Sequence, residues 1–171
     1  LSSESRFCLL TERHPIGAIR KLNNQLFPVT SPMDRFVTFV AAVLDPATHM
    51  VTLVNAGHPA VLVLPPGSGI AMRLDATGPA LGLIEAGLFR SHGVPLDPGS
   101  VLVAVTDGVY DALDQNGEEF GDARLADVLR EGRDRSAAEL CKAILEAVRA
   151  HRGARQDQDD VTAMVVKASK P

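Results

Sequence analysis

The chain has 171 residues, the size of one domain, and its 46% hydrophobic and 22% charged content is typical of a folded globular protein. Its formal net charge of −4 leaves no basic excess for contact with a phosphate backbone, so we expect no nucleic-acid partner. We find no apolar run of about 18 residues and no signal-peptide pattern, and we expect a cytoplasmic protein without a membrane span. Two cysteines exclude a disulfide framework and a four-thiolate zinc site.

Two helices are expected at the start of the chain. The first is the tail of a helix that ends near Leu10, after a short apolar stretch. The second starts at Pro15, a residue that suits the first turn of a helix, and the stretch Pro28–Pro32 stops it. Its apolar residues recur at three- and four-residue spacing: Ile16, Ile19, Leu22 and Leu26.

From Phe36 the sequence has the β-branched and apolar character of strands, and short turns rich in Pro, Gly and Asp separate them. The expected strands are Phe36–Leu44, Val51–Val54, Ala60–Leu64, Ile70–Leu74, Leu88–Val94 and Val101–Thr106. The turns 45–48 and 65–69 are short enough to make two hairpins, which favours antiparallel pairing.

The last third of the chain predicts two helices and one more strand. A short helix covers Asp122–Arg130, and a longer one runs from Ser136 to about Arg152 and opens with a capping box between Ser136 and Glu139. Gly153 stands where a left-handed residue commonly ends a helix. A final strand over Val161–Val166 completes an α+β protein in which helices pack on antiparallel sheet.

Two acidic positions stand at the ends of predicted strands. Asp107 directly follows the strand Val101–Thr106 and precedes Gly108, while Asp159 and Asp160 precede the last strand. If those strands are neighbours, the carboxylates meet although about fifty residues separate them. Carboxylate oxygens favour Mg²⁺ or Mn²⁺ over zinc. The alternative is that an aspartate at a strand end serves only as a turn former or a helix cap.

Five motifs, in order, resemble those of the bacterial SpoIIE/RsbU-type serine phosphatases, relatives of the type 2C metal-dependent (PPM) phosphatases. Thr106–Gly108 resembles the family's TDG motif, and Asp159–Thr162 its terminal DDVT. The other three are Asn55–Pro59 (NAGHP), Gly78–Gly82 (G-x-PLG, with Ala80 in place of proline) and Asn116–Gly121 (GEEFG). Together the motifs span about Phe36 to Val166.

The resemblance implies two antiparallel sheets packed as a sandwich, flanked by helices, with a two-metal site that holds Mn²⁺ or Mg²⁺. In that site Asp107 and Asp159 would bind the same ion. Gly108, Asp111, Asp160 and His58 are candidates for residues around these ligands, although packing or loop capping is the competing role for His58. The implied activity is hydrolysis of phosphoserine or phosphothreonine by metal-activated water, without a covalent phospho-enzyme.

One part of the family pattern is absent from this sequence. The family carries an upstream GD-x-SGHG motif whose aspartate bridges the metals, and residues 1–35 do not contain it. We therefore expect residues 1–171 to form a single truncated domain, the C-terminal two-thirds of a phosphatase domain without its N-terminal strands. We also expect this chain alone to bind metal weakly or not at all, and its exposed sheet edges to favour a homodimer.

The resemblance also implies partners. The usual substrate is a phosphorylated anti-sigma-factor antagonist with a STAS domain, and an upstream sensor or receiver domain usually regulates the phosphatase. Two alternatives stay open: a non-catalytic interaction module that keeps the phosphatase scaffold, and a Mg²⁺-dependent hydrolase of small phosphate esters.

Overall fold

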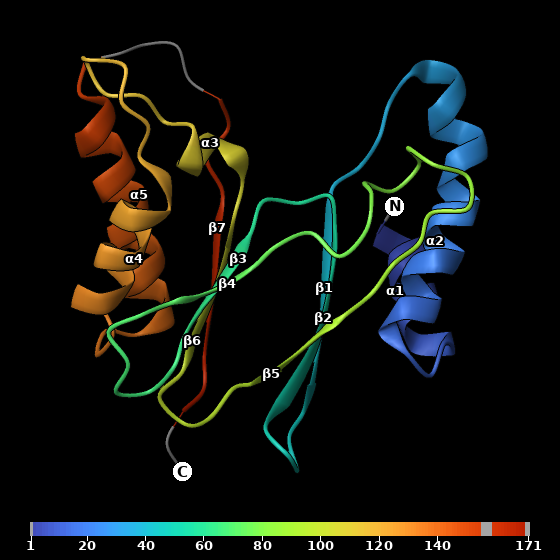
Figure 1. Cartoon of the computed structure of the whole chain (residues 1–171), viewed down its shortest axis with the longest axis horizontal. Coiled ribbons are helices and arrows are strands. Elements are labelled where there is room, and N and C mark those ends of the chain that lie inside the picture. The colour runs from blue at the N-terminus through green and yellow to red at the C-terminus, as the bar shows by residue number, and fades with distance from the viewer. Residues whose placement is uncertain (1, 155–158, 170–171) are drawn as a thin grey trace. The chain divides into compact units, whose positions relative to one another are not determined.

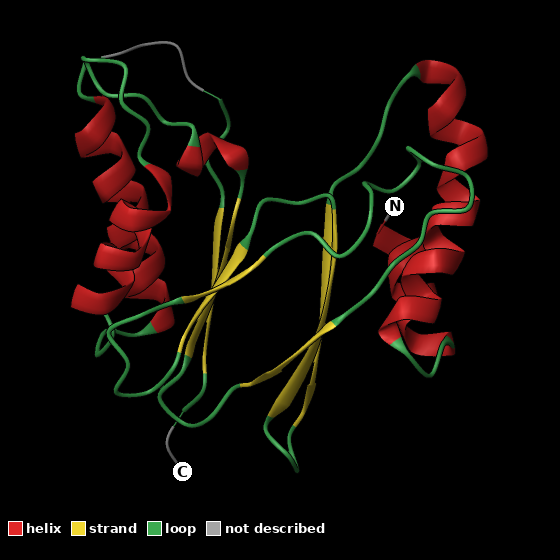
Figure 2. Ribbon diagram, viewed as in Figure 1, coloured by secondary structure: helices red, strands yellow, loops and turns green. Residues whose placement is uncertain are grey.

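The computed structural model describes residues 2–154 and 159–169, and the chain separates into two compact units (Figure 1). The first unit contains Leu1–His58 and Asp75–Pro95, and the second contains Pro59–Leu74 and Leu96–Pro171. The chain therefore passes from one unit to the other three times. Each unit has its own sheet and its own pair of long helices (Figure 2).

The first unit is built from a three-stranded antiparallel sheet in the order β1-β2-β5 and two helices. Its elements are α1 (Ser2–Thr11), α2 (Pro15–Thr30), a single 3₁₀ turn (Ser31–Met33), β1 (Phe39–Asp45), β2 (Met50–Ala56) and β5 (His92–Pro95). The hairpin expected between the first two strands is confirmed, with Phe39 paired to Ala56 and Asp45 to Met50.

The second unit contains a four-stranded antiparallel sheet in the order β4-β3-β6-β7 and three helices. Its elements are β3 (Val61–Leu64), β4 (Met72–Leu74), β6 (Val101–Val105), α3 (Asp107–Tyr110), α4 (Gly121–Glu131), α5 (Ala137–Arg152) and β7 (Ala163–Lys167). The α+β class expected from the strand and helix pattern is confirmed, and so are the two antiparallel sheets with helices that the family resemblance implied.

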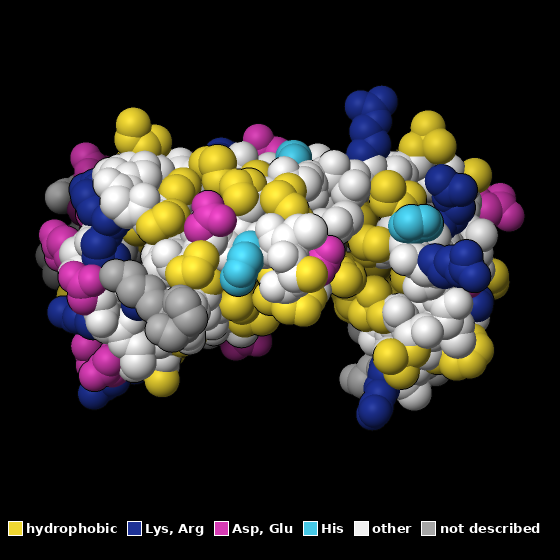
Figure 3. All heavy atoms as spheres, turned by 90° about the horizontal axis from the view of Figure 1, so that it is seen from below, with side chains coloured by type: hydrophobic (Ala, Val, Ile, Leu, Met, Phe, Trp, Pro, Cys, Tyr) yellow, Lys and Arg dark blue, Asp and Glu magenta, His cyan; other side chains and the backbone are white. Residues whose placement is uncertain are grey.

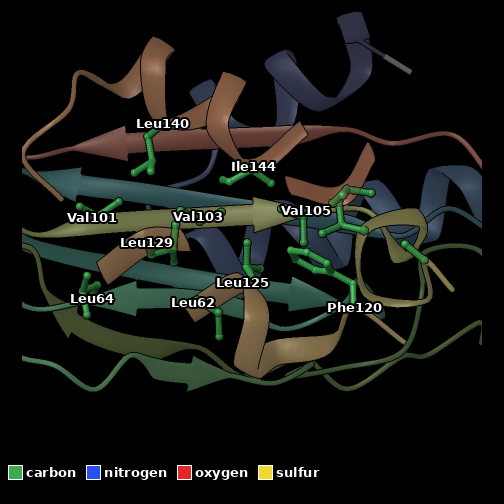
Figure 4. Close-up of a cluster of buried hydrophobic side chains, with 13 residues drawn as sticks. Leu62, Leu64, Val101, Val103, Val105, Phe120, Leu125, Leu129, Leu140 and Ile144 are labelled. Carbon is green, nitrogen blue, oxygen red and sulfur yellow. The ribbon is translucent and has the colours of Figure 1, made fainter. Parts of the chain in front are cut away.

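The core of the second unit forms because β6 is apolar at every position and the helices turn their leucine faces toward it. All five residues of β6 are buried. Leu125 and Leu129 of α4, and Leu140 and Ile144 of α5, are fully buried in the same cluster, which Figure 4 shows around the strand. Burial of each such side chain contributes about 1.5–3 kcal/mol to the stability of the fold.

The core of the first unit depends on the apolar face of α2. Ile19 and Leu22 are buried against β2, where Val54 is also fully buried, and against the segment that carries Leu81 and Phe89. The periodicity of the sequence had indicated this face. The helix therefore lies on the sheet through the residues whose spacing predicted it.

The helix α2 ends at Thr30, within the stretch Pro28–Pro32 that was expected to stop it, so this expectation is confirmed. Pro28 lacks an amide hydrogen and cannot donate the helical bond to the carbonyl of Asn24, and the helix ends two residues later. Thr30 Oγ1 donates to the carbonyl of Leu26 (3.0 Å), and Ser31 N donates to the carbonyl of Phe27. These two bonds satisfy carbonyl groups in the last turn of α2.

Several strands begin later than predicted, β4 and β5 among them. β4 begins at Met72 rather than Ile70, because Ile70 belongs to the turn in which Ser68 Oγ accepts its amide (3.0 Å). β5 begins at His92 rather than Leu88, because Phe89 turns its ring into the core against Gly78. Gly153 has a positive φ of 59°, as its place after α5 suggested, but its ψ of −127° is not that of a left-handed helix.

The surface carries charges of both signs. In the face seen in Figure 3, Lys and Arg side chains alternate with Asp and Glu side chains at the end that carries α4 and α5. The described helices also include none long and apolar enough to cross a membrane.

The capping box at the start of α5 gives a direct stability test. Ser136 Oγ accepts the amide of Glu139 (3.3 Å). The Glu139 carboxylate accepts the hydroxyl (2.7 Å) and the amide (2.8 Å) of Ser136, and these bonds, that of the hydroxyl above all, hold the pKa of Glu139 below its usual value. We expect Ser136→Ala to lower the free energy of unfolding by about 1 kcal/mol in a denaturant titration. Because the folded-state pKa of Glu139 is lowered, its contribution is present at neutral pH and is lost as the pH falls through that lowered pKa. An unchanged denaturation midpoint at neutral pH would contradict the assignment.

Candidate metal centre

The pairing of β6 with β7 brings the two acidic positions to one end of the second sheet. Val105 pairs with Ala163 at the end of the ladder. Beyond it, Thr106 N donates to the carbonyl of Thr162 (3.1 Å), and Thr106 Oγ1 both donates to the carbonyl of Asp160 (3.0 Å) and accepts the amide of Thr162 (3.0 Å). Segments 54 residues apart in the sequence are therefore joined by three hydrogen bonds immediately beside the candidate ligands.

Both candidate carboxylates are exposed, and each is bound by one nearby amide. Asp107 is the first residue of α3, and its Oδ1 accepts the amide of Gly108 (2.9 Å). Asp159 Oδ1 accepts the amide of Asp160 in the same way (2.9 Å). Each carboxylate keeps a second oxygen outside these bonds. The two groups therefore have the solvent access and the hard oxygen donors that a divalent ion needs.

Gly108 allows the two segments to approach each other closely. A Cβ atom at this position would overlap the carbonyl oxygen of Asp160. On the other side, the carbonyl of Gly108 accepts a hydrogen bond from the buried guanidinium of Arg152 (2.7 Å), at the end of α5. Sequence reasoning missed Arg152, because nothing in the local pattern distinguishes it from the other basic residues of the last turn.

A cavity of about 350 Å³ in the second unit lies beside Asp107. Asp111, which ends α3, lines it, and its amide donates to the carbonyl of Asp107 (2.8 Å). Tyr110 also lines it and donates from its hydroxyl to the carbonyl of Ala60 (2.8 Å). The sequence indicated Asp111 but not Arg73, Tyr110, Glu119 or Asp122, which come to this cavity from β4, α3 and the segment at the start of α4.

The motif Asn116–Gly121 builds the turn that leads into α4. Asp114 Oδ1 accepts the amides of Asn116 (2.8 Å) and Glu118 (2.9 Å), and these bonds, that of Glu118 above all, lower the pKa of Asp114. Phe120 is buried and meets the ring of His151 edge to face at 5.4 Å. The motif therefore shapes the loop that carries Glu119.

The other two motifs, apart from Pro59, lie in the first unit, where they pack against each other. The buried Asn55 accepts the amide of His58 on its side-chain oxygen (2.9 Å), and Gly57, with φ of 66°, leaves room for Ala80, whose amide nitrogen would lie 2.6 Å from an added Cβ. His58 Nδ1 lies 3.3 Å from Thr38 Oγ1. His58 thus takes part in the packing of its own loop, and it does not belong to the unit that holds Asp107.

The ligands that this end of the sheet offers match the chemistry of a divalent ion. Mg²⁺ requires about six oxygen ligands, commonly one or two carboxylates and several waters. Asp107 and Asp159 supply two carboxylates of the right chemistry. The described residues contain no group of three or more acidic, histidine or cysteine side chains arranged to hold a metal. The donor set therefore fits an ion that keeps waters or takes further ligands.

Comparison with known proteins identifies relatives over nearly the whole chain. The family model described as stage II sporulation protein E (SpoIIE) matches residues 2–169. Protein IcfG of Synechocystis sp. is 31% identical over 151 residues, which is 88% of this chain and 24% of IcfG. Phosphoserine phosphatase RsbP of Bacillus subtilis is 28% identical over 149 residues, or 85% of this chain and 35% of RsbP. The chain thus spans about a quarter to a third of these relatives.

Solved structures share the fold at lower sequence identity. The SiaA-PP2C domain of Pseudomonas aeruginosa superposes with a TM-score of 0.81 and 19% identity, over 96% of this chain and 66% of that domain. The manganese-presoaked phosphatase domain of SpoIIE from Bacillus subtilis has a TM-score of 0.69 and 16% identity, over 99% and 74% of the two chains. The architecture of this chain is therefore that of the PP2C-like phosphatases.

The close approach at Gly108 predicts a sharp effect of one added methyl group. Gly108→Ala must push the Asp160 segment away, and we expect a loss of about 1–3 kcal/mol of unfolding free energy. Gly93→Ala is the matched control, because a Cβ there meets only the end of the Met50 side chain at 3.9 Å. Thermal unfolding of both variants checks this. Equal stability of the two would show that the segments do not approach as described.

Proposed function

We propose a metal-dependent phosphoprotein phosphatase function for this chain, which belongs to the stage II sporulation protein E (SpoIIE) family. The reaction is hydrolysis of phosphoserine or phosphothreonine, in which a water oxygen attacks phosphorus and the side-chain hydroxyl of the substrate leaves. The observation that carries the proposal is the β6–β7 pairing, which sets Asp107 and Asp159 at one end of the sheet.

In this proposal Asp107 and Asp159 hold one Mn²⁺ or Mg²⁺ ion. Their chemistry supports the assignment, since both are exposed carboxylates with an oxygen outside local hydrogen bonds. When bound, such ions make hydroxide available near neutral pH and neutralise phosphoryl oxygens. The SpoIIE domain described as presoaked with manganese supports the choice of metal.

Two further residues keep Asp107 in place. Arg152 fixes the carbonyl of Gly108, and the missing side chain of Gly108 lets the Asp160 carbonyl pack against the start of α3. These two contacts restrain the backbone at Gly108, the residue that follows Asp107. Asp160 follows Asp159 in the chain and Asp111 lines the cavity beside Asp107, so both add negative charge near the ion. Gly108 and Arg152 are positioning residues, because they act through Asp107.

The substrate class follows from the relatives. RsbP is described as a phosphoserine phosphatase, which supports a phosphoserine substrate here. We extend the proposal to signalling in the cytoplasm, with a phosphorylated STAS-type anti-sigma-factor antagonist as the substrate and an upstream sensor or receiver domain as the regulator. The five family motifs of the sequence support this extension.

The test is Mn²⁺-dependent phosphate release from a phosphoserine protein and from p-nitrophenyl phosphate, using the protein as its gene encodes it. We expect Asp107→Asn and Asp159→Asn each to lower kcat by about 100-fold or more, because each removes a charged metal ligand. Asp97→Asn is the matched control, since Asp97 is an acid of the same unit that precedes β6 instead of following it. The control should keep the rate of the unchanged protein.

Two results would contradict the proposal. Full activity of Asp107→Asn would remove this residue from the site. The absence of Mn²⁺-dependent hydrolysis in the unchanged protein would instead favour an interaction module that keeps the phosphatase scaffold and binds a partner without catalysis.

A further inference from the structure

The cavity beside Asp107 is acidic. Its charged lining consists of Asp107, Asp111, Glu119 and Asp122, with Arg73 as the one basic residue among them. Arg73 forms an ion pair with Asp122. Asp111 and Glu119 are exposed and take part in no ion pair within the described residues. With Asp107 assigned to the metal, the cavity keeps a surplus of negative charge.

A second cavity of about 350 Å³ adjoins the first, and its lining is mainly apolar. Leu62, Ile70, Ala71, Ala123 and Ala126 supply this surface. Ile70 is 80% exposed, so its apolar side chain is available for contact with a bound molecule. The cavity lies between α4 and the hairpin of β3 and β4, so it stands on the same unit as the candidate metal ligands.

The ion pair between Arg73 and Asp122 connects the two cavities. Both residues line both of them. About half of each side chain is exposed, and the ion pair forms part of the wall of both cavities. The other carboxylate oxygen of Asp122, Oδ1, is buried and accepts no hydrogen bond in the described part of the chain. Because the two cavities share Arg73 and Asp122, their linings together extend from Asp107 to Ile70.

We propose that the two cavities form a groove for the segment of the phosphoprotein substrate that flanks its phosphoserine. This inference rests on the proposed function, which places the phosphoryl group at Asp107. A basic side chain of the substrate then meets Asp111 and Glu119 in the first cavity. An apolar side chain beyond it packs against Ile70, Ala123 and Ala126 in the second.

The charge and polarity of the groove support this occupant. A basic residue next to phosphoserine complements the negative surplus of the first cavity, while an acidic one would be repelled. Burial of one apolar side chain in the second cavity discriminates between substrates by roughly tenfold or more. A metal site that acts on a phosphoryl group has no such selectivity of its own. The groove would therefore supply the choice of phosphoprotein.

The probes are a set of phosphoserine nonapeptides in a serine- and alanine-based host, with p-nitrophenyl phosphate as a small ester that cannot reach the second cavity. Leucine is placed in turn at each of the four positions on either side of phosphoserine. We expect one position to raise kcat/KM about tenfold over serine at that position. Arginine between it and phosphoserine should raise kcat/KM further, and glutamate should lower it.

The variant Ala123→Arg places a long charged side chain in the second cavity. We expect it to lower the ratio of kcat/KM for the leucine peptide to kcat/KM for p-nitrophenyl phosphate about tenfold. Ala150→Arg is the matched control, an exposed alanine of α5 that lines neither cavity, and it should leave this ratio unchanged.

The outcomes separate this inference from the proposed function. An unchanged leucine preference in Ala123→Arg, or an equal loss on peptide and small ester, would overturn the groove while the phosphatase stands. If the unchanged protein hydrolyses neither probe, the proposed function fails, and fluorescence anisotropy of the same labelled peptides then tests the groove. Leucine-selective binding that Ala123→Arg removes would support it, and binding without such selectivity would overturn it.

Discussion

The pairing of β6 with β7 is the constraint on which the candidate site depends. It joins the end of the buried strand β6 to the start of β7, and Thr106 extends the ladder by hydrogen bonds to both Thr162 and Asp160. The apolar core holds β6 in place, since all its residues are buried and Val101, Val103 and Val105 pack in one cluster with the buried residues of α4 and α5. The placement of Asp107 and Asp159 at one end of the sheet thus follows from sheet pairing and core packing, and neither aspartate has a positive φ.

The backbone around Asp107 is fixed by contacts to backbone atoms, and neither of these contacts uses the Asp107 carboxylate. Gly108 allows contact with the Asp160 carbonyl, and Arg152 uses its buried guanidinium on a backbone carbonyl. This arrangement leaves the carboxylate exposed and able to accept a cation. It also links α5 to the site, because the last turn of that helix supplies the arginine.

Much of the fold could be predicted from the sequence, because hydrophobic periodicity and turn residues are local signals. The stripe of α2, the hairpins and the capping box at Ser136 were all readable in this way. Asp107 and Asp159 could be singled out by their place at strand ends and by the family motifs. Arg73 and Asp122 could not, since residues 49 positions apart meet only once the hairpin and α4 are packed together. The end of α2 at Thr30 lies in the stretch Pro28–Pro32 that marked it in the sequence, because proline is itself a local signal for a helix end.

Mn²⁺ affinity measured in a double-mutant cycle tests the central claim, that Asp107 and Asp159 hold the same ion. Binding would be followed by the electron paramagnetic resonance signal of free Mn²⁺, in the unchanged protein, in Asp107→Asn, in Asp159→Asn and in the double variant. If both carboxylates bind one ion, each single change weakens the affinity, and the double change weakens it by clearly less than the two effects combined. Independent, additive losses, or a loss confined to one of the two residues, would contradict a shared site.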